Sequence, residues 1–375
     1  MKRRFTLFLL LSLISMSMYA FYPAVFRTGD GYYPDAVMDI EHDAQYVYVA
    51  SGYGLFVIDK ATGEQTVFSA REGTLDYTPI SLAMYGDDLW IGTAEGKLLC
   101  YNNGSIQVYD LGIGGRLSNI AFDSNGNMYI SDFGVVGYKI NMSSKTIEEQ
   151  FETFNRYSGG ITSHLCLDGN DALWIGNYGG SAMAKYGLGK YTKVKGTQYM
   201  IKDHPEWPGY YVSSMAVDDD GCMWYVNYGN TEIGKWLTKI ENDEVAVSYE
   251  CPCFGYDMMF DRQQRLWMLG KNGPLFMMKD GEFSSYSCTE ESNVWTCIDI
   301  DGDDIYIGTD KGVLRFKNNT FSIVPVEASS PSGIANASIM RPATDNVFFD
   351  LQGRRINGKP EKGIYIQNGK KKVVR

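Results

Sequence analysis

The sequence predicts an all-β fold: a seven-bladed β-propeller of four-stranded antiparallel blades, followed by a short C-terminal β tail. Three observations predict it. One pattern of strands and turns occurs seven times, an aromatic residue within it recurs every 39 to 50 residues, and the composition is rich in aromatic residues and glycine. Repeats of this length are typical of propeller blades, which cannot bury both of their faces alone.

The composition favours strands joined by tight turns. Among the 375 residues are 27 Tyr, 7 Trp and 41 Gly, but only 11 Pro. Aromatic runs broken by glycine are an all-β signature.

Each copy of the repeat reads as an apolar strand, an acidic turn, an aromatic strand, a glycine turn and a third strand. A fourth strand follows, as in the segments from Glu64, Ser105 and Thr320. The seven copies begin at Val37, Ile80, Leu117, Thr162, Val212, Tyr256 and Val294.

The second strand of every copy carries one large ring, called the anchor below. We expect the anchors to be buried between neighbouring sheets, because alternation along a strand turns one face toward the next blade. The tryptophans among them are therefore predicted to be core residues and not sugar platforms. The anchors are Tyr48, Trp90, Tyr129, Trp174, Trp224, Trp267 and Tyr306.

The N-terminus reads as a secretory signal peptide over residues 1–20. A basic start, Lys2 to Arg4, precedes the apolar run Phe5–Ile14, and Ala20 is a plausible cleavage position. That run is too short for a membrane span, and no later stretch approaches ~20 apolar residues. We expect no membrane span and a secreted protein, in the periplasm, at the cell surface or outside the cell. The propeller is predicted over 21–326, a linker over 327–345 and the tail over 346–375.

The charge is unevenly distributed. Residues 21–345 carry 23 basic and 43 acidic residues, a net charge of −20, whereas residues 346–375 carry 8 basic and 2 acidic ones. An acidic body repels phosphate backbones, which argues against nucleic acid as a partner. We expect a monomer.

Cofactor and metal sites are not indicated. Acidic turns such as Asp218–Gly221 lack the distant glutamate of a calcium loop, and their recurrence at one place in the repeat predicts hairpin turns. Seven cysteines without a C-x-x-C pair, Cys166, Cys222 and Cys297 among them, are interpreted as buried thiols. Cys251 and Cys253 lack a second ligand pair for zinc. We therefore predict no cofactor and no metal.

Catalytic residues are not identified either. There are three histidines and no G-x-S-x-G motif. Carboxylates from different blades could still meet at the channel. An enzyme therefore stays an open alternative, although the pattern favours a binding protein.

Two segments resemble a known repeat. Leu89–Leu98 (LWIGTAEGKL) and Ile305–Leu314 (IYIGTDKGVL) are similar to the two-component-regulator propeller repeat of periplasmic sensors in Bacteroidetes. The resemblance implies a propeller that binds glycans or carries signalling contacts. Blade 5 also contains Thr231–Lys235 (TEIGK), which resembles a turn of streptogramin B lyases, but it occurs only once.

The tail has a resemblance of its own. Asn346–Arg375 is similar to the C-terminal half of type IX secretion sorting domains, which implies export across the outer membrane and cleavage. The alternative is a small basic β-hairpin attached to the propeller. The matching positions are Asp350, Gly353, Arg354, Gly363, Tyr365, Ile366, Lys370, Lys371 and Val373.

One face of the propeller supplies the candidate ligand-binding residues. The loops into the first strands and those between the second and third strands meet on one face, where function commonly resides. Aromatic rings there suit the C–H faces of sugars, and amides and acids suit their hydroxyls. His164 either points into the channel or is a satisfied core histidine. The candidates are Tyr53, Glu95, Phe133, His164, Tyr178, Tyr211, Tyr228, Tyr256, Lys271, Trp295 and Asp310.

The sequence thus predicts a secreted, non-enzymatic binding propeller that recognises a glycan or a protein through this aromatic-rich face. Two alternatives stay open. One is a polysaccharide lyase or hydrolase that uses carboxylates at the channel mouth, and the other is an accessory protein of the cell surface or of secretion.

Overall fold

The structure is a computed structural model. It describes residues 36–326 apart from 133, 135, 154–159, 180–186, 205–206, 208–210, 229–235, 254, 271–273 and 289–293, and strand segments outside that range. The predicted signal peptide, 1–20, lies outside the described residues. The chain divides into two compact units, Met1–Ala328 and Ser329–Arg375.

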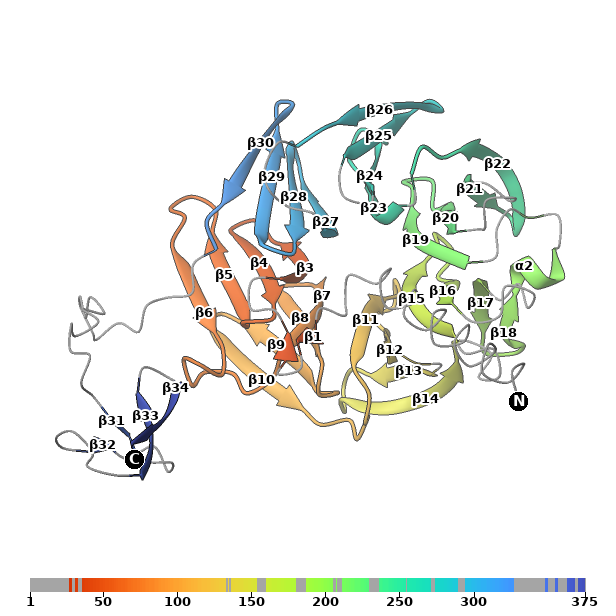
Figure 1. Ribbon diagram of the computed structural model, residues 1–375. Helices are drawn as coiled ribbons and strands as arrows, with labels where there is room; N and C mark the ends of the chain where they lie inside the picture. Colours follow the sequence, from red (N-terminus) through yellow and green to blue (C-terminus); the bar gives the residue numbers. More distant parts are fainter. Residues whose placement is uncertain are drawn as a thin grey trace, which may run out of the picture. The chain divides into compact units, whose positions relative to one another are not determined.

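Within the described part of the first unit, seven four-stranded antiparallel sheets follow one another around a ring, and the predicted seven-bladed propeller is confirmed (Figure 1). Every sheet consists of four consecutive strands. Blade 1 contains β3 (Val37–His42), β4 (Tyr46–Ser51), β5 (Leu55–Asp59) and β6 (Gln65–Phe68). Blade 2 contains β7 (Pro79–Tyr85), β8 (Asp88–Thr93), β9 (Leu98–Asn102) and β10 (Ser105–Tyr109).

The remaining blades repeat this order. Blade 3 contains β11 (Leu117–Phe122), β12 (Met128–Asp132), β13 (Val136–Asn141) and β14 (Thr146–Glu152). Blade 4 contains β15 (Gly160–Leu167), β16 (Leu173–Gly179), β17 (Leu188–Thr192) and β18 (Gly196–Tyr199), and α2 (Met200–Asp203) follows it. Blade 5 contains β19 (Tyr211–Val217), β20 (Met223–Tyr228), β21 (Trp236–Glu241) and β22 (Glu244–Glu250).

Blade 6 contains β23 (Gly255–Phe260), β24 (Leu266–Gly270), β25 (Leu275–Lys279) and β26 (Glu282–Tyr286). Blade 7 contains β27 (Trp295–Asp301), β28 (Asp304–Thr309), β29 (Gly312–Lys317) and β30 (Thr320–Val324). Before the ring, β1 (Arg27–Thr28) pairs with β2 (Gly31–Tyr32).

The second unit forms its own small sheet, in the order β32-β31-β33-β34. Its strands are β31 (Phe348–Phe349), β32 (Arg355–Ile356), β33 (Gly363–Gln367) and β34 (Lys370–Val374). Six positions of the sorting-domain resemblance lie on β33 and β34, whereas Asp350, Gly353 and Arg354 lie outside the described residues.

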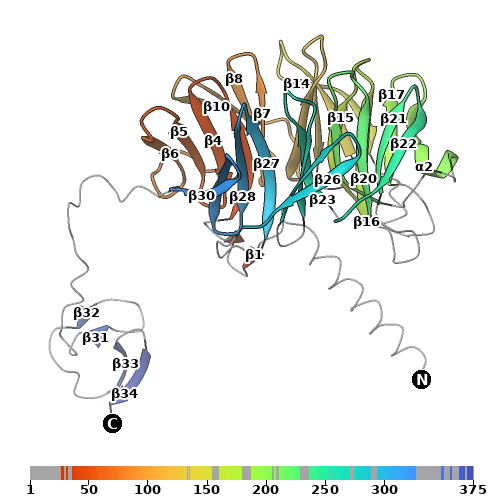
Figure 2. The same ribbon diagram turned by 90° about the horizontal axis from the view of Figure 1, so that it is seen from above.

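The first strands of the blades, β3, β7, β11, β15, β19, β23 and β27, lie innermost and contact one another in order around the ring. Seen from the side, the blades form a disc with two ends (Figure 2). We call the end with the blade-to-blade connections and the loops between second and third strands the loop face. The end with the turns between first and second and between third and fourth strands is the hairpin face.

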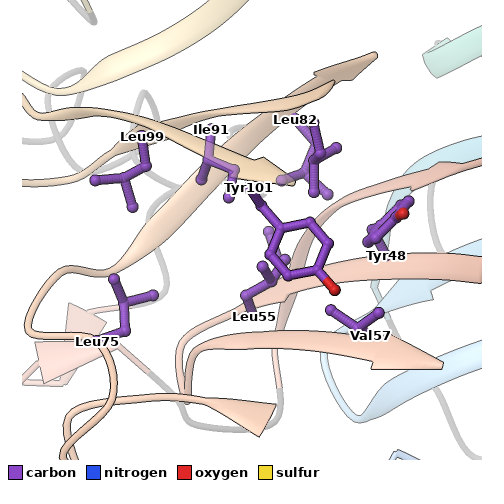
Figure 3. Packing of buried hydrophobic residues seen from close by; sticks show 10 residues of the cluster. Tyr48, Leu55, Val57, Leu75, Leu82, Ile91, Leu99 and Tyr101 are labelled. Carbon is purple, nitrogen blue, oxygen red and sulfur yellow. The ribbon is translucent and has the colours of Figure 1, made fainter. Parts of the chain in front are cut away.

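Aromatic and aliphatic side chains fill the space between neighbouring blades. Between blades 1 and 2, Tyr48 meets Tyr101 edge to face with ring centroids 5.7 Å apart, and Leu55 and Ile91 are fully buried (Figure 3). Six of the seven anchors are at most 7% exposed, and Tyr129 is partly buried. Since a buried aromatic residue removes a large apolar area from water, the anchors are the main wedges of the ring, as predicted.

The acidic turns hold these anchors. In five blades the aspartate that opens the first turn accepts a hydrogen bond from the polar atom of the anchor. The pairs are Asp43–Tyr48 (2.6 Å), Asp123–Tyr129 (3.3 Å), and Asp168–Trp174, Asp218–Trp224 and Asp261–Trp267 (each 2.8 Å). The other carboxylate oxygen caps the turn; that of Asp168 accepts from the N–H groups of Asn170 and Ala172. The hairpin interpretation of the acidic turns is confirmed.

Blades 2 and 7 use a shorter turn. Tyr85 pairs with Asp88 and Asp301 with Asp304, so two residues connect the strands. Gly86 and Gly302 adopt φ of 62° and 61°, which such tight turns need and glycine supplies without strain. The Trp90 indole nitrogen makes no hydrogen bond within the described residues, since its turn has no capping aspartate in that place.

Among the residues that the structure describes, the first and last blades exchange no strand, because each of their sheets consists of its own four strands. Ionic contacts join them at the hairpin end of the inner strands. His42 Nδ1 lies 2.8 Å from Asp299 Oδ2, and Lys60 Nζ lies 2.5 Å from Asp301 Oδ2.

All seven cysteines fall within the described residues, and Cys100, Cys166, Cys222 and Cys297 are free thiols. Cys297 is buried in β27, while Cys166 in β15 is partly exposed. Cys222 differs from the expectation of a core strand: it belongs to the turn before β20 and is partly exposed.

Candidate functional site

Strand pairing brings several of the predicted ligand-binding residues to the loop face. In an antiparallel blade the start of the first strand lies beside the end of the second, as where Tyr211 of β19 pairs with Tyr228 of β20. Residues just after the second strand, such as Tyr53, Glu95 and Asp310, therefore lie at the same end as residues that begin the first strand, such as Tyr256.

Tyr53 is a half-buried ring with fixed surroundings. Its hydroxyl donates to Glu72 Oε1 over 3.2 Å, its ring lies 5.8 Å from that of Phe56, and the Arg71 guanidinium lies 5.9 Å from the ring centroid. A ring held from three sides presents a preformed surface to a ligand.

Glu95 and Asp310 are the two carboxylates among the predicted ligand-binding residues of this face. Glu95 is exposed and accepts a hydrogen bond from the Thr78 N–H over 2.9 Å. Asp310 is half-exposed, and its own N–H donates to the Val294 carbonyl over 3.0 Å. Both loops are tied by a backbone group to the connection that enters the same blade.

The other candidates divide into three groups. Tyr211 and Tyr256 are partly exposed at the starts of β19 and β23, and Tyr256 also packs against the core of blades 6 and 7. Trp295 is only 2% exposed and packs in the core of blades 6 and 7, because the first residue of β27 turns inward. Tyr178 and Tyr228 have defined strand positions but undescribed side chains, and Phe133, Lys271 and the Thr231–Lys235 turn lie outside the described residues.

The first strand of each blade carries one polar residue at an equivalent position, below the loop face. This residue comes two positions before the residue that pairs with the anchor. Sequence reasoning identified His164 among them and missed the rest. An alignment of the seven copies on their anchors would have found this inner layer. Its members are Asp39, Ser81, Asn119, His164, Ser214, Asp257 and Cys297.

Several residues of the inner layer bond to the next blade. Asp39 Oδ2 accepts from the Leu82 N–H over 2.7 Å, and Asp257 Oδ2 accepts from the Ile298 N–H over 2.9 Å. Ser81 Oγ donates to the Leu117 carbonyl over 2.9 Å. The layer therefore joins neighbouring blades.

His164 and Asp257 meet although they belong to blades 4 and 6, which are not neighbours. His164 Nε2 lies 3.9 Å from Asp257 Oδ1, and the two side chains are 24% and 25% exposed. His164 Nδ1 and Ser214 Oγ make no hydrogen bond within the described residues. Both atoms are buried, whereas the side chains of His164 and Asp257 stay partly exposed and can meet a ligand.

Blades 6, 7 and 1 bring four carboxyl groups together: Asp39, Glu41, Asp257 and Asp299. Burial raises the pKa of Asp39 to about 8, and the charges of Asp257 and Asp299 act in the same direction. Burial also raises the pKa of Asp257 to about 7 and that of Glu41 well above its usual range. Asp39, Glu41 and Asp257 are only partly exposed and are surrounded by protein, so their charged forms are poorly solvated.

The chemistry of the inner layer follows from these protonation states. Burial lowers the pKa of His164 to about 4, so its imidazole is neutral at neutral pH, beside carboxyls that are partly protonated. Neutral imidazole and carboxyl groups both donate and accept hydrogen bonds, as ligand hydroxyls do. Within the described residues, no three His, Cys, Asp or Glu side chains are arranged to hold a metal ion.

Comparison with known proteins identifies the fold. No protein-family model matches the chain, and no curated protein matches it. Virginiamycin B lyase from Staphylococcus aureus is a similar solved structure, with a TM-score of 0.62 and 16% identity over 75% of this chain and 94% of that one.

Two other similar structures are an extracellular domain and a bacterial surface component. The extracellular domain of a hybrid two-component system from B. thetaiotaomicron gives a TM-score of 0.60 and 15% identity over 92% of this chain and 43% of that one. PorZ, a surface component of the type-IX secretion system of Porphyromonas gingivalis, gives a TM-score of 0.57 and 15% identity over 91% of this chain and 59% of that one. At these identities the likeness shows the propeller fold. No helix among the described residues has the length and apolar character to cross a membrane.

Proposed function

We propose that this chain is a secreted binding propeller that recognises a glycan chain on its loop face. The observation that carries the proposal is the combination, at one end of the channel, of half-exposed tyrosines and a neutral hydrogen-bonding layer. Tyr53 and Tyr256 supply rings, and the partly exposed side chains of His164 and Asp257 supply polar groups of the inner layer. Rings with a few convergent polar groups are what sugar chains require of a site.

Secretion is supported by the leader pattern of residues 1–20 and by the extracellular and surface origin of two similar structures. The sorting-domain resemblance of the tail supports a final position at or beyond the outer membrane.

The test is retention on immobilised polysaccharides, with released products measured in the same samples. We expect retention without product, and loss of retention in Tyr256→Ala. Tyr85→Ala, which removes a 41% exposed tyrosine from the hairpin face, is the control. If no polysaccharide retains the protein, glycan recognition is wrong. Cross-linking at the cell surface then tests for a protein partner, the role favoured by the likeness to PorZ.

A second candidate function is a polysaccharide lyase or hydrolase at the channel mouth. Asp257, with a pKa of about 7 and 3.9 Å from His164, could exchange a proton with a substrate near neutral pH. Release of product by the wild-type protein, and its absence in Asp257→Asn, would favour this enzyme over the binding protein.

A further inference from the structure

The hairpin face has a recess, remote from the loop face. At several blade junctions on this face, turns of adjacent blades bond directly to each other. The Ser124 N–H donates to Asp171 Oδ1 over 2.8 Å, that of Gly169 to the Gly221 carbonyl over 2.9 Å, and that of Asp219 to Gln264 Oε1 over 3.0 Å. These contacts close the junctions from blade 3 to blade 6.

Between blades 6 and 7 a pocket of about 270 Å³ lies at the corresponding place. The blade 6 turn runs from Asp261 to Arg265, whereas the blade 7 turn has only Gly302 and Asp303 between its strands. The space around Gly302 is open, because a side chain there would meet no atom within 4 Å. A short turn beside a longer one leaves this recess.

The floor of the pocket is apolar and rigid. Trp267 and Phe316 are 4% and 3% exposed, and their ring centroids lie 5.7 Å apart. Ile300 and Ile305 line it as well. A floor of ring edges and branched aliphatic groups offers contact to the C–H groups of a ligand.

The rim is polar, and several of its side chains have hydrogen-bonding groups that the described chain does not use. Arg265 is fixed by the 2.6 Å bond from its Nε to Asp261 Oδ2, and its guanidinium carbon lies 5.3 Å from the Trp267 ring centroid. The exposed side chains of Asp303, Asn318 and Asn319 make no hydrogen bond within the described part of the chain.

The charges on the rim indicate which chemical class of ligand the pocket binds. The Arg265 charge is balanced by Asp261, so an anion meets no free cation and faces the carboxylate of Asp303. A cation gains little from the exposed carboxylate of Asp303, because water already solvates that charge. Two amides, one carboxylate and the outer guanidinium nitrogens form an alternating set of donors and acceptors, which matches hydroxyl groups. The volume lies just below the ~300 Å³ at which pockets begin to hold drug-sized ligands, so one ring fills it.

We propose that this pocket binds a neutral polyol of the size of one sugar ring. The site goes beyond the loop-face function, because the two faces share none of these residues.

Two turns of blade 2 offer matched controls. Asp87 follows Gly86 as Asp303 follows Gly302, and Asn103-Gly104 joins β9 to β10 as Asn318-Asn319 joins β29 to β30. The substitution Asn319→Gly therefore gives blade 7 the Asn-Gly turn that blade 2 already uses, at a φ of 60° that glycine accepts. It removes one amide without strain.

The experiment is ligand-observed NMR on the full chain with neutral methyl hexopyranosides, and with glucuronate and glucosamine as charged counterparts. We expect a neutral glycoside to bind and the double variant Asp303→Ala/Asn319→Gly to lose at least tenfold in affinity. The matched variant Asp87→Ala/Asn103→Gly should bind as wild type does. Thermal unfolding verifies that both variants fold.

Three results overturn the proposal: no neutral glycoside binds, only a charged sugar binds, or the blade 7 double variant binds as wild type does. The loop-face variant Tyr256→Ala separates the two sites, since it should keep monosaccharide binding even where polysaccharide retention is lost.

Discussion

His42 and Asp299 join the first blade to the last, with 2.8 Å between His42 Nδ1 and Asp299 Oδ2. The second ring nitrogen lies 3.6 Å from Asp301 Oδ1, and Asp301 also holds Lys60. Since blades 7 and 1 exchange no strand within the described part of the chain, this cluster together with the apolar contacts of β3 and β27 keeps the ring closed.

His42→Ala is expected to lower the free energy of unfolding by about 2 kcal/mol near pH 6, because a charge-assisted hydrogen bond is lost. The bond to Asp299 raises the pKa of His42 above 6.5. Its contribution is therefore fully present below pH 6.5 and is lost as the pH rises through the raised pKa. Urea unfolding at about pH 6 and about pH 9 measures this; an equal loss at both would contradict the assignment.

Asp168→Ala should cost about 3 kcal/mol, because the buried Trp174 N–H loses its acceptor and the turn loses its cap. Asp87→Ala, in the exposed turn of blade 2, should stay within about 0.5 kcal/mol of wild type. Thermal or urea unfolding of both variants is the measurement. Equal stabilities would mean that the aspartate does not hold the anchor.

Asp257→Asn tests the inner layer through its pH dependence. The Asp257 carboxyl has a pKa of about 7 in the folded protein, against an ordinary value of 3.8. Its contribution to the free energy of unfolding is therefore fully present below pH 3.8 and is lost as the pH rises through about 7. Asparagine cannot ionise. Relative to wild type, the variant should therefore gain a few kcal/mol between about pH 4 and about pH 8, as followed by unfolding across that range. A constant difference would show that Asp257 is ionised throughout.

Gly169→Ala tests the contact between blades 4 and 5. An added methyl group would lie 2.7 Å from the Gly221 Cα, where only backbone movement makes room. We expect a loss of about 2 kcal/mol. Gly114→Ala, which meets no atom within 4 Å, is the control and should be near neutral. Similar melting temperatures for the two variants would contradict the close approach.

Much of the fold could be predicted because the repeat encodes it locally. The ring of Trp174 and the aspartate six residues before it recur in the same places, so burial and turn type follow from the pattern. The ring closure could not be predicted in this way. It depends on which residues of the first and last copies meet in space, and His42 and Asp299 are 257 positions apart.

The candidate site was predicted less completely. Tyr53 and Tyr256 lie on the loop face as expected, because loop position follows from blade order. Trp295 was assigned to a loop, but it is the first residue of β27 and alternation turns it inward. Asp39 and Asp257 were overlooked, since one carboxylate in an apolar strand gives no sign that a partner from another blade faces it.

The most direct test of the loop-face proposal is isothermal titration with the best-retained polysaccharide. We expect the double variant Tyr53→Ala/Tyr256→Ala to bind at least tenfold more weakly than wild type, with Tyr85→Ala on the hairpin face unchanged. Equal affinities for all three proteins, with the fold verified by circular dichroism, would contradict recognition at the loop face.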